Sequence, residues 1–208
     1  MFYLINTPWW VKQWLYPGYL WSMPPDQKKI YLSFDDGPHP AATPLVLDIL
    51  QQYHAKASFF CIGKNVAAHP DIYARILNEG HVTGNHSFDH LNGWKTADDV
   101  YLDNIKKAAV YIDSSLFRPP YGRITRFQGQ LLKEKMRARI VMWSVLSADF
   151  DTRITPEKCW KNVKGATRNG SIVVFHDSEK AMPRMEYALR QTLEWFSGKG
   201  FVFEKLAM

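Results

Sequence analysis

From Lys29 to the end of the chain, short apolar runs rich in Val, Ile and Phe alternate with stretches of helical length and period. The seven predicted strands are Ile30–Phe34, Ala57–Cys61, His81–Thr83, Leu116–Arg118, Ile140–Val145, Ser171–Phe175 and Phe201–Glu204. The six predicted helices are Thr43–Tyr53, Pro70–Gly80, Ala97–Ile112, Thr125–Lys135, Pro156–Arg168 and Pro183–Ser197. Strand-helix alternation in one domain implies parallel strands with right-handed crossovers, so the chain is predicted to form an α/β fold, either an open doubly wound sheet or a barrel.

The length of the chain favours a single domain. At 208 residues it can bury one full α/β core but is short for two such domains and a linker. No internal repeat or low-complexity tract interrupts it. We therefore expect one domain over residues 29–208, preceded by a separable arm over residues 1–28.

The charged residues argue against a nucleic-acid partner. Lys and Arg number 26 against 20 Asp and Glu, which gives a net charge of +6, yet the basic residues are scattered and form no block. With 46% hydrophobic residues, the composition is that of an ordinary soluble globular protein, which we expect to be a monomer. Cys61 and Cys159 are too few for a disulfide framework and are predicted to be free thiols.

The first segment of the chain is unusually aromatic. Residues 2–23 contain Trp9, Trp10, Trp14, Tyr16, Tyr19 and Trp21 around a single lysine, Lys12. Such a segment either contacts a membrane interface or wraps the domain and closes its core, and the sequence leaves both interpretations open. Pro8 and Pro17 interrupt it, so no secretory signal or membrane-spanning helix is expected, and a cytoplasmic or peripheral membrane location is favoured.

Polar side chains that could do chemistry follow the predicted strands almost one by one. Asp35 and Asp36 follow the first, His86 the third, Arg118 closes the fourth, Asp149 follows the fifth and His176 the sixth. Because parallel strands share one carboxyl face, these side chains are expected to converge on a single site.

A divalent metal is the simplest partner for two adjacent carboxylates, which would otherwise repel each other. His86 and His90 are spaced i, i+4, which predicts that both imidazoles lie on one face of a helical turn. Together with Asp36 they make three ligands and leave positions for water and substrate. Zn²⁺ is the expected ion, with Co, Mn, Fe and Ni as alternatives.

The motif set resembles that of the polysaccharide deacetylase family, whose shared unit is the NodB homology domain. Five segments match in order: Ser33-Phe34-Asp35-Asp36-Gly37-Pro38, Asn85-His86-Ser87-Phe88-Asp89-His90, Arg118-Pro119-Pro120-Tyr121-Gly122, Asp149-Phe150 and Val174-Phe175-His176. The resemblance implies a distorted, TIM-barrel-like (β/α) barrel of seven strands and a metal-dependent removal of acetyl groups from acetylated polysaccharide or oligosaccharide.

The resemblance also implies a role for each residue. Asp35 is the expected general base and His176 the general acid, paired with Arg118 and Asp149 respectively. The backbone N–H of Tyr121, held by Pro119 and Pro120, is expected to stabilise the oxyanion. The implied substrate pocket is formed by Tyr121, Pro120, Phe150 and Val174. Phe150 and Val174 replace the usual Trp and Leu of the family, which bears on substrate preference.

Several alternatives remain open at this stage. The acetyl group could be an N-acetyl of N-acetylglucosamine or an O-acetyl ester of xylan-type chains. A catalytically silent glycan-binding protein on the same fold is a second class, and two histidines with one carboxylate also describe a mononuclear iron oxygenase. The oxygenase would have no use for Asp35, Arg118, Asp149 and His176. His39 and Asp177 are further candidates for contact near the ion.

Overall fold

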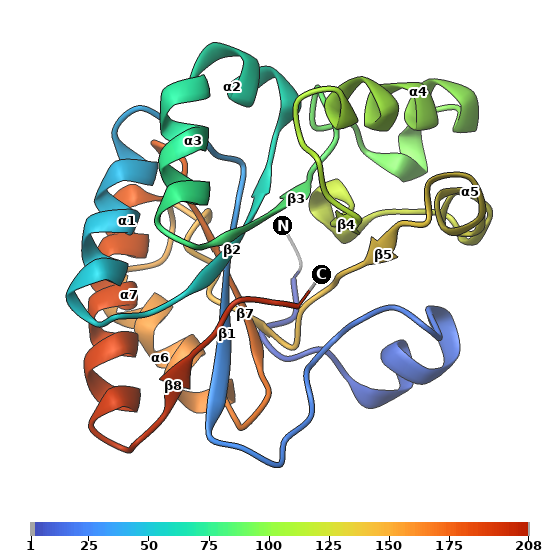
Figure 1. Cartoon of the computed structure of the whole chain (residues 1–208). Coiled ribbons are helices and arrows are strands. Elements are labelled where there is room, and N and C mark those ends of the chain that lie inside the picture. The colour runs from blue at the N-terminus through green and yellow to red at the C-terminus, as the bar shows by residue number, and fades with distance from the viewer. Residues whose placement is uncertain (1–2, 208) are drawn as a thin grey trace.

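The computed structural model describes residues 3–207, and its centre is a curved, parallel sheet (Figure 1). Residues 1–2 of the predicted arm and residue 208 of the predicted domain lie outside the described residues. The strands are β1 (Lys29–Asp35), β2 (Ala57–Cys61), β3 (Val82–Asn85), β4 (Leu116–Phe117), β5 (Arg139–Ile140), β6 (Val145–Leu146), β7 (Ile172–His176) and β8 (Val202–Phe203). Their order is β5-β4-β3-β2-β1-β7-β6, with β8 beside the start of β1.

Helices cover the outer face of this sheet (Figure 1). They are α1 (Ala42–Gln52), α2 (Gly63–Ala68), α3 (Pro70–Asn78), α4 (Asp98–Ala109), α5 (Arg126–Met136), α6 (Pro156–Ala166) and α7 (Met182–Ser197). The largest core cluster packs the central strands against α1, α6 and α7. Within this cluster the Phe34 ring stacks on the rings of Phe59 and Phe175, whose centroids lie 5.1 and 5.9 Å from the Phe34 centroid. The predicted α/β barrel-like fold is therefore confirmed as a curled half-barrel.

The prediction of one strand over Ile140–Val145 is wrong. This segment forms two short strands, since β5 pairs with β4 whereas β6 pairs with β7. Between them, the carbonyls of Val141 and Met142 accept hydrogen bonds from the Arg118 guanidinium at 3.3 and 3.1 Å. Because these backbone carbonyls bind the buried Arg118 side chain, they do not pair with a neighbouring strand. Over the described residues β5 and β6 are the two edges of the sheet, which is open between them.

The N-terminal segment lies along this open side. Leu20 N–H donates to Ile140 O at 2.9 Å, and Met142 N–H donates to Leu20 O at 2.7 Å. Nearer the start, Leu146 N–H donates to Ile5 O at 2.9 Å. Trp21 is buried in a second core cluster with residues of α4 and α5. These contacts support the packing interpretation of the arm, while the division at residue 28 stays a prediction.

The remaining findings on the fold are brief. Both cysteines are free, as predicted, and both are buried. None of the helices formed by residues 3–207 has the length and apolar character needed to cross a bilayer. The sequence pattern missed α2, whose six residues begin at Gly63 and are too short to show a helical period.

Candidate active site

The predicted site residues converge at the carboxyl ends of the strands. Asp35 ends β1 and His176 ends β7, and the two residues face each other in the register of these neighbouring strands. His86 follows β3 directly and Arg118 follows β4. The parallel sheet therefore brings together side chains that lie up to about 140 residues apart in the chain.

Asp36, His86 and His90 form a compact group of three ligands. Asp36 Oδ1 lies 3.2 Å from His90 Nε2 and 3.8 Å from His86 Nε2, and the ligand atoms of all three residues lie within 4.8 Å of one another. His86 Nδ1 is 2.7 Å from the carbonyl oxygen of Arg118. Because a carbonyl can only accept, Nδ1 carries the proton, and the Nε2 lone pair faces the carboxylate.

The charge state of this group suits a metal ion. Burial lowers the pKa of His86 well below its ordinary value, and it also lowers the pKa of His90, so both imidazoles are neutral near pH 7. Asp36 Oδ1 is buried and has no hydrogen-bond partner among residues 3–207. A buried carboxylate oxygen without a donor, facing two neutral imidazoles, is the donor set that a divalent cation requires.

The prediction that a helical turn places His86 and His90 is wrong. Residues 86–90 form a loop in which Ser87 and His90 have positive φ values of 60° and 59°. Side-chain amides replace the helical hydrogen bonds, because Asn85 Oδ1 accepts from Ser87 N–H at 2.8 Å. Asn104 Oδ1 of α4 accepts from the next two N–H groups, at 2.9 and 3.0 Å. The two imidazoles lie close together as the i, i+4 spacing predicted, but a loop and not a helical turn brings them there.

A buried carboxyl group holds the loop that carries Asp36. Asp177 Oδ1 accepts from Gly37 N–H at 3.0 Å, and Asp177 Oδ2 accepts from the Thr43 hydroxyl at 2.5 Å. Burial, opposed by the hydrogen bond from Thr43, raises the pKa of Asp177 to about 8. Asp177 does not belong to the ligand group. His39 is not turned to the ion either, since its Nδ1 accepts from the first N–H groups of α1.

Asp35 and Arg118 form a fully buried ion pair. Arg118 Nη1 donates to Asp35 Oδ1 at 2.6 Å and to Ser33 Oγ at 2.8 Å. The rest of the guanidinium binds the two carbonyls between β5 and β6 and lies 3.9 Å from the centroid of the Phe60 ring. These contacts hold the cation against Asp35.

His176 and Asp149 form the second pair. His176 Nδ1 lies 2.7 Å from Asp149 Oδ1, and His176 N–H donates to Asp149 Oδ2 at 2.7 Å. Burial by itself would lower the pKa of His176. The Asp149 carboxylate, with smaller contributions from Asp36 and Asp35, outweighs burial and raises the pKa of His176 to about 9. The imidazolium form therefore persists at neutral pH.

A cleft of about 460 Å³ joins these groups. The ligand group, Asp35 and His176 line it, as do Tyr121, Phe150 and Val174 of the predicted pocket. Pro120 is buried and is not among the lining residues, and its assignment to the pocket stays a prediction. It precedes Tyr121, whose backbone adopts a positive φ of 61° and whose ring lies 4.5 Å from the His90 ring.

Sequence reasoning missed one wall of the cleft. Residues of the N-terminal segment line it together with the catalytic candidates: Tyr3, Leu4, Thr7, Val11, Tyr16 and Trp21. The Tyr3 ring packs edge-on against Phe150, which in turn packs against His176. The aromatic content of the segment was visible in the sequence, but nothing in the pattern placed it beside strand ends far along the chain.

Comparison with known proteins gives consistent matches. Residues 22–136 match the family model described as polysaccharide deacetylase. A peptidoglycan-N-acetylglucosamine deacetylase of Bacillus cereus is 36% identical over 175 residues, which cover 81% of this chain and 62% of the relative. A chitooligosaccharide deacetylase of Azorhizobium caulinodans is 33% identical, with 87% of this chain and 94% of the relative covered.

A solved structure is similar over nearly the whole chain. It is the crystal structure of a peptidoglycan N-acetylglucosamine deacetylase in complex with 4-naphthalen-1-yl-N-oxidanyl-benzamide, with a TM-score of 0.87 and 33% identity. The match covers 96% of this chain and 95% of the other. By contrast, this chain spans only 37% of the length of a similar peptidoglycan deacetylase from Listeria monocytogenes.

Proposed function

The chain belongs to the polysaccharide deacetylase family, and we propose that it is a metal-dependent hydrolase that removes acetyl groups from N-acetylated carbohydrate. One observation carries the proposal. A carboxylate held by a buried arginine and an imidazolium held by a buried carboxylate flank a three-residue ligand group in the same cleft. This arrangement supplies a base, an acid and a cation site around a space that a substrate can enter.

In this proposal Asp36, His86 and His90 hold the cation, through one carboxylate oxygen and two Nε2 atoms. A divalent cation there supplies Lewis-acid polarisation of the acetyl carbonyl and makes water a better nucleophile at neutral pH. Two imidazoles and one carboxylate are ligands that favour Zn²⁺ over Mg²⁺ or Ca²⁺, and Co, Mn, Fe and Ni remain alternatives.

Asp35 acts as the general base. Its carboxylate lines the cleft, while Arg118 behind it fixes its position. A carboxylate is a weak base, and it would suffice where a cation held by Asp36, His86 and His90 lowers the pKa of water. Asp35 and Asp36 both line the cleft.

His176 acts as the general acid. The doubly hydrogen-bonded Asp149 orients the imidazolium, so that its free Nε2–H faces the cleft and can protonate the leaving nitrogen. Asp149 thus favours the protonated form of His176 that an acid requires, while Arg118 holds Asp35 in position as the base.

The acyl group is positioned by the remaining cleft residues. The backbone N–H of Tyr121 is the proposed oxyanion donor, in a turn made rigid by two prolines. Phe150 and Val174 give an apolar wall for the acetyl methyl. Relatives named for peptidoglycan N-acetylglucosamine and for chitooligosaccharides support an N-acetylglucosamine-containing substrate.

The test is acetate release by zinc- or cobalt-loaded protein from acetylated chitin oligomers, peptidoglycan fragments and acetylated xylan. We expect turnover of the N-acetylated substrates. Acetate from xylan alone would replace the proposal by an O-acetyl esterase, and binding of glycans without acetate release would indicate a silent glycan-binding protein.

Two variants separate the roles of the adjacent carboxylates. Asp36→Asn should lose the metal, whereas Asp35→Asn should retain it and lose turnover, as measured by metal content after dialysis and by acetate release. Full activity of Asp35→Asn would contradict its assignment as the base. Competition by 4-naphthalen-1-yl-N-oxidanyl-benzamide, the compound bound in the similar structure, gives an independent probe of the cleft.

A further inference from the structure

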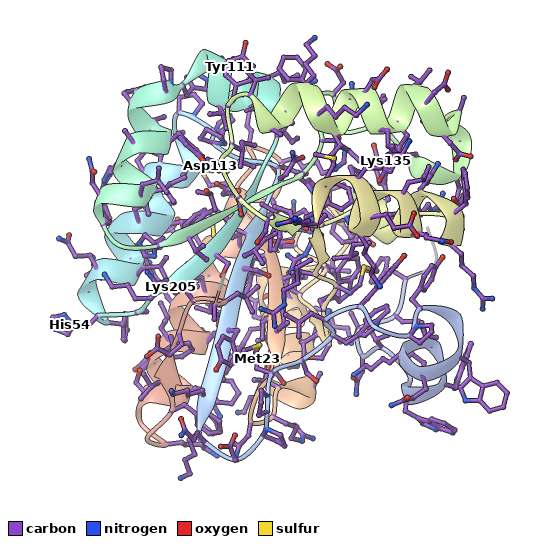
Figure 2. All side chains as sticks on the ribbon, turned by 45° about the vertical axis from the view of Figure 1, so that its right-hand side comes forward. Met23, His54, Tyr111, Asp113, Lys135 and Lys205 are labelled. Carbon is purple, nitrogen blue, oxygen red and sulfur yellow. The ribbon has the colours of Figure 1, made fainter. Side chains whose placement is uncertain are left out.

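We infer that the tryptophan turn, defined as residues Trp9 to Trp14, is a docking surface for an anionic lipid bilayer. It overlaps a short π-helix, Val11–Leu15, at the edge of the molecule. In Figure 2 this segment, drawn in faint blue at the lower right, stands out from the body of the fold. That the turn binds a bilayer does not depend on catalysis. That this binding brings the protein to its substrate rests on the proposed function.

Three indole side chains of this turn are largely exposed to solvent. Trp9 is 69% exposed, Trp10 50% and Trp14 71%, whereas Trp21 of the same segment is only 7% exposed. Three largely exposed tryptophans within six residues form a concentrated apolar surface of the kind that marks an interaction site. Indole combines an apolar body with an N–H donor, which favours the boundary between lipid headgroups and acyl chains.

The fold does not need these three side chains. The segment is held by its backbone hydrogen bonds to β5 and β6, by buried Trp21, and by the Tyr16 hydroxyl, which donates to Ile124 O at 2.9 Å. Packing therefore accounts for the other aromatic residues of the segment, and it leaves Trp9, Trp10 and Trp14 unexplained.

The charge around the turn selects an anionic surface. The first acidic residue of the chain is Asp26, so the turn and its flanks carry Lys12 and no carboxylate. Two cations of α5 adjoin it, because Arg126 donates to Trp14 O at 3.0 Å and Lys133 Nζ donates to Gly18 O at 3.3 Å. Glu134 of the same helix lines the groove beside Trp14 with them, so two cations face one carboxylate there. Tryptophan beside Lys and Arg is the composition that binds headgroups of negative charge.

The same segment borders the cleft. Val11 within the turn and Tyr16 just after it line the cavity that holds Asp36 and His176. A bilayer in contact with the turn therefore lies beside the mouth of this cavity. If the proposed function holds, the protein acts on acetylated glycan that is attached to, or lies against, a lipid surface, rather than on polymer free in solution.

The experiment is co-sedimentation of the full chain with vesicles of phosphatidylglycerol and phosphatidylcholine, and with vesicles of phosphatidylcholine alone. We expect binding to the anionic vesicles and much weaker binding to the neutral ones. The triple variant Trp9→Ser, Trp10→Ser, Trp14→Ser should lower the partition coefficient at least about tenfold, because it removes the apolar part of the contact. Its thermal unfolding should match that of the wild type.

Matched controls come from elsewhere on the surface. Val110→Ser and Tyr111→Ser remove exposed apolar groups, 80% and 43% exposed, at the end of α4. Figure 2 labels Tyr111 at the top of the molecule, at the opposite end from the turn. Both controls should bind anionic vesicles as the wild type does. Lys12→Gln combined with Lys133→Gln should weaken binding and reduce its sensitivity to salt.

Several results would overturn the inference. Wild-type protein that ignores anionic vesicles, or a triple variant that binds them undiminished, would do so. So would a triple variant that loses turnover of soluble chitin oligomers while the wild type shows no vesicle binding, because the turn would then be a glycan platform. Asp35→Asn protein separates the two proposals, since it should bind vesicles fully whether or not the proposed chemistry is correct.

Discussion

Replacing Asp149 by Asn should move the alkaline limit of activity by more than two pH units. In the folded protein His176 donates two hydrogen bonds to the Asp149 carboxylate: the ring Nδ1–H to Oδ1, and the backbone N–H to Oδ2, both at 2.7 Å. Asn keeps the shape but removes the charge, and it offers only one accepting oxygen to these two donors. Asp149 is fully buried, so no solvent replaces the missing charge.

The magnitude follows from the pKa of His176. Burial lowers it, but the charge of Asp149 and its hydrogen bond raise it from 6.5 to about 9 overall. With a pKa of about 9, roughly 90% of His176 carries the acidic proton at pH 8, whereas with 6.5 only about 3% does. The Asn variant should therefore lose about 30-fold in kcat/KM at pH 8, and less below pH 6.

The assay is a pH profile of acetate release from a chitin oligomer between pH 5 and 10, with metal loading checked at each pH. The wild type should lose activity only near pH 9, and Asp149→Asn should lose it at or below about pH 6.5. An alkaline limb that stays in place in the variant would refute both the acid role of His176 and the role of Asp149 in setting its pKa.

The same pKa shift predicts how stability depends on pH. Since folding raises the pKa of His176, the folded state binds this proton more tightly, and the stabilisation is complete below about pH 6.5 and lost as the pH rises through about 9. The shift in the pKa corresponds to about 3 kcal/mol in the free energy of unfolding. Urea unfolding of metal-free protein should show a larger loss between pH 6 and pH 9.5 in the wild type than in Asp149→Asn, because Asp177, whose pKa is raised to about 8, contributes to the loss in both proteins.

Three further substitutions test the buried framework. Arg118→Met should lower the free energy of unfolding by about 3 to 5 kcal/mol in urea titrations, because it leaves a buried carboxylate unpaired. Gly37→Ala places a methyl against the Asp177 carboxyl and should weaken zinc binding in calorimetry, whereas Gly165→Ala, which meets no atom within 4 Å, should leave it unchanged. Trp21→Ala should cost about 3 to 5 kcal/mol in thermal unfolding, since its indole is buried.

How far the sequence predicted the fold depended on the length of each element. The long central strands β1, β2 and β7 were predicted within one or two residues, because continuous apolar runs between helices of clear period leave few other interpretations. The two-residue strands β5 and β6 were merged into one. An apolar pattern reports which residues are buried, not which are paired in a sheet. The segment between these strands is buried, but its carbonyls accept hydrogen bonds from Arg118.

Within the site, the sequence by itself determined which side chains gather. Asp36 follows β1, and His86 and His90 both follow β3, so the parallel topology places all three at the same end of the sheet. Chain order and strand alternation are local properties, so they can be read without coordinates.

Only the tertiary structure decided the geometry of that gathering. Asn85 and Asn104 set the loop that turns His90 toward Asp36, and Asp177 fixes Gly37. It likewise decided that the N-terminal segment walls the cleft and leaves three tryptophans uncovered. These are contacts between individual residues that are distant in the chain, and no periodic pattern in a sequence predicts them.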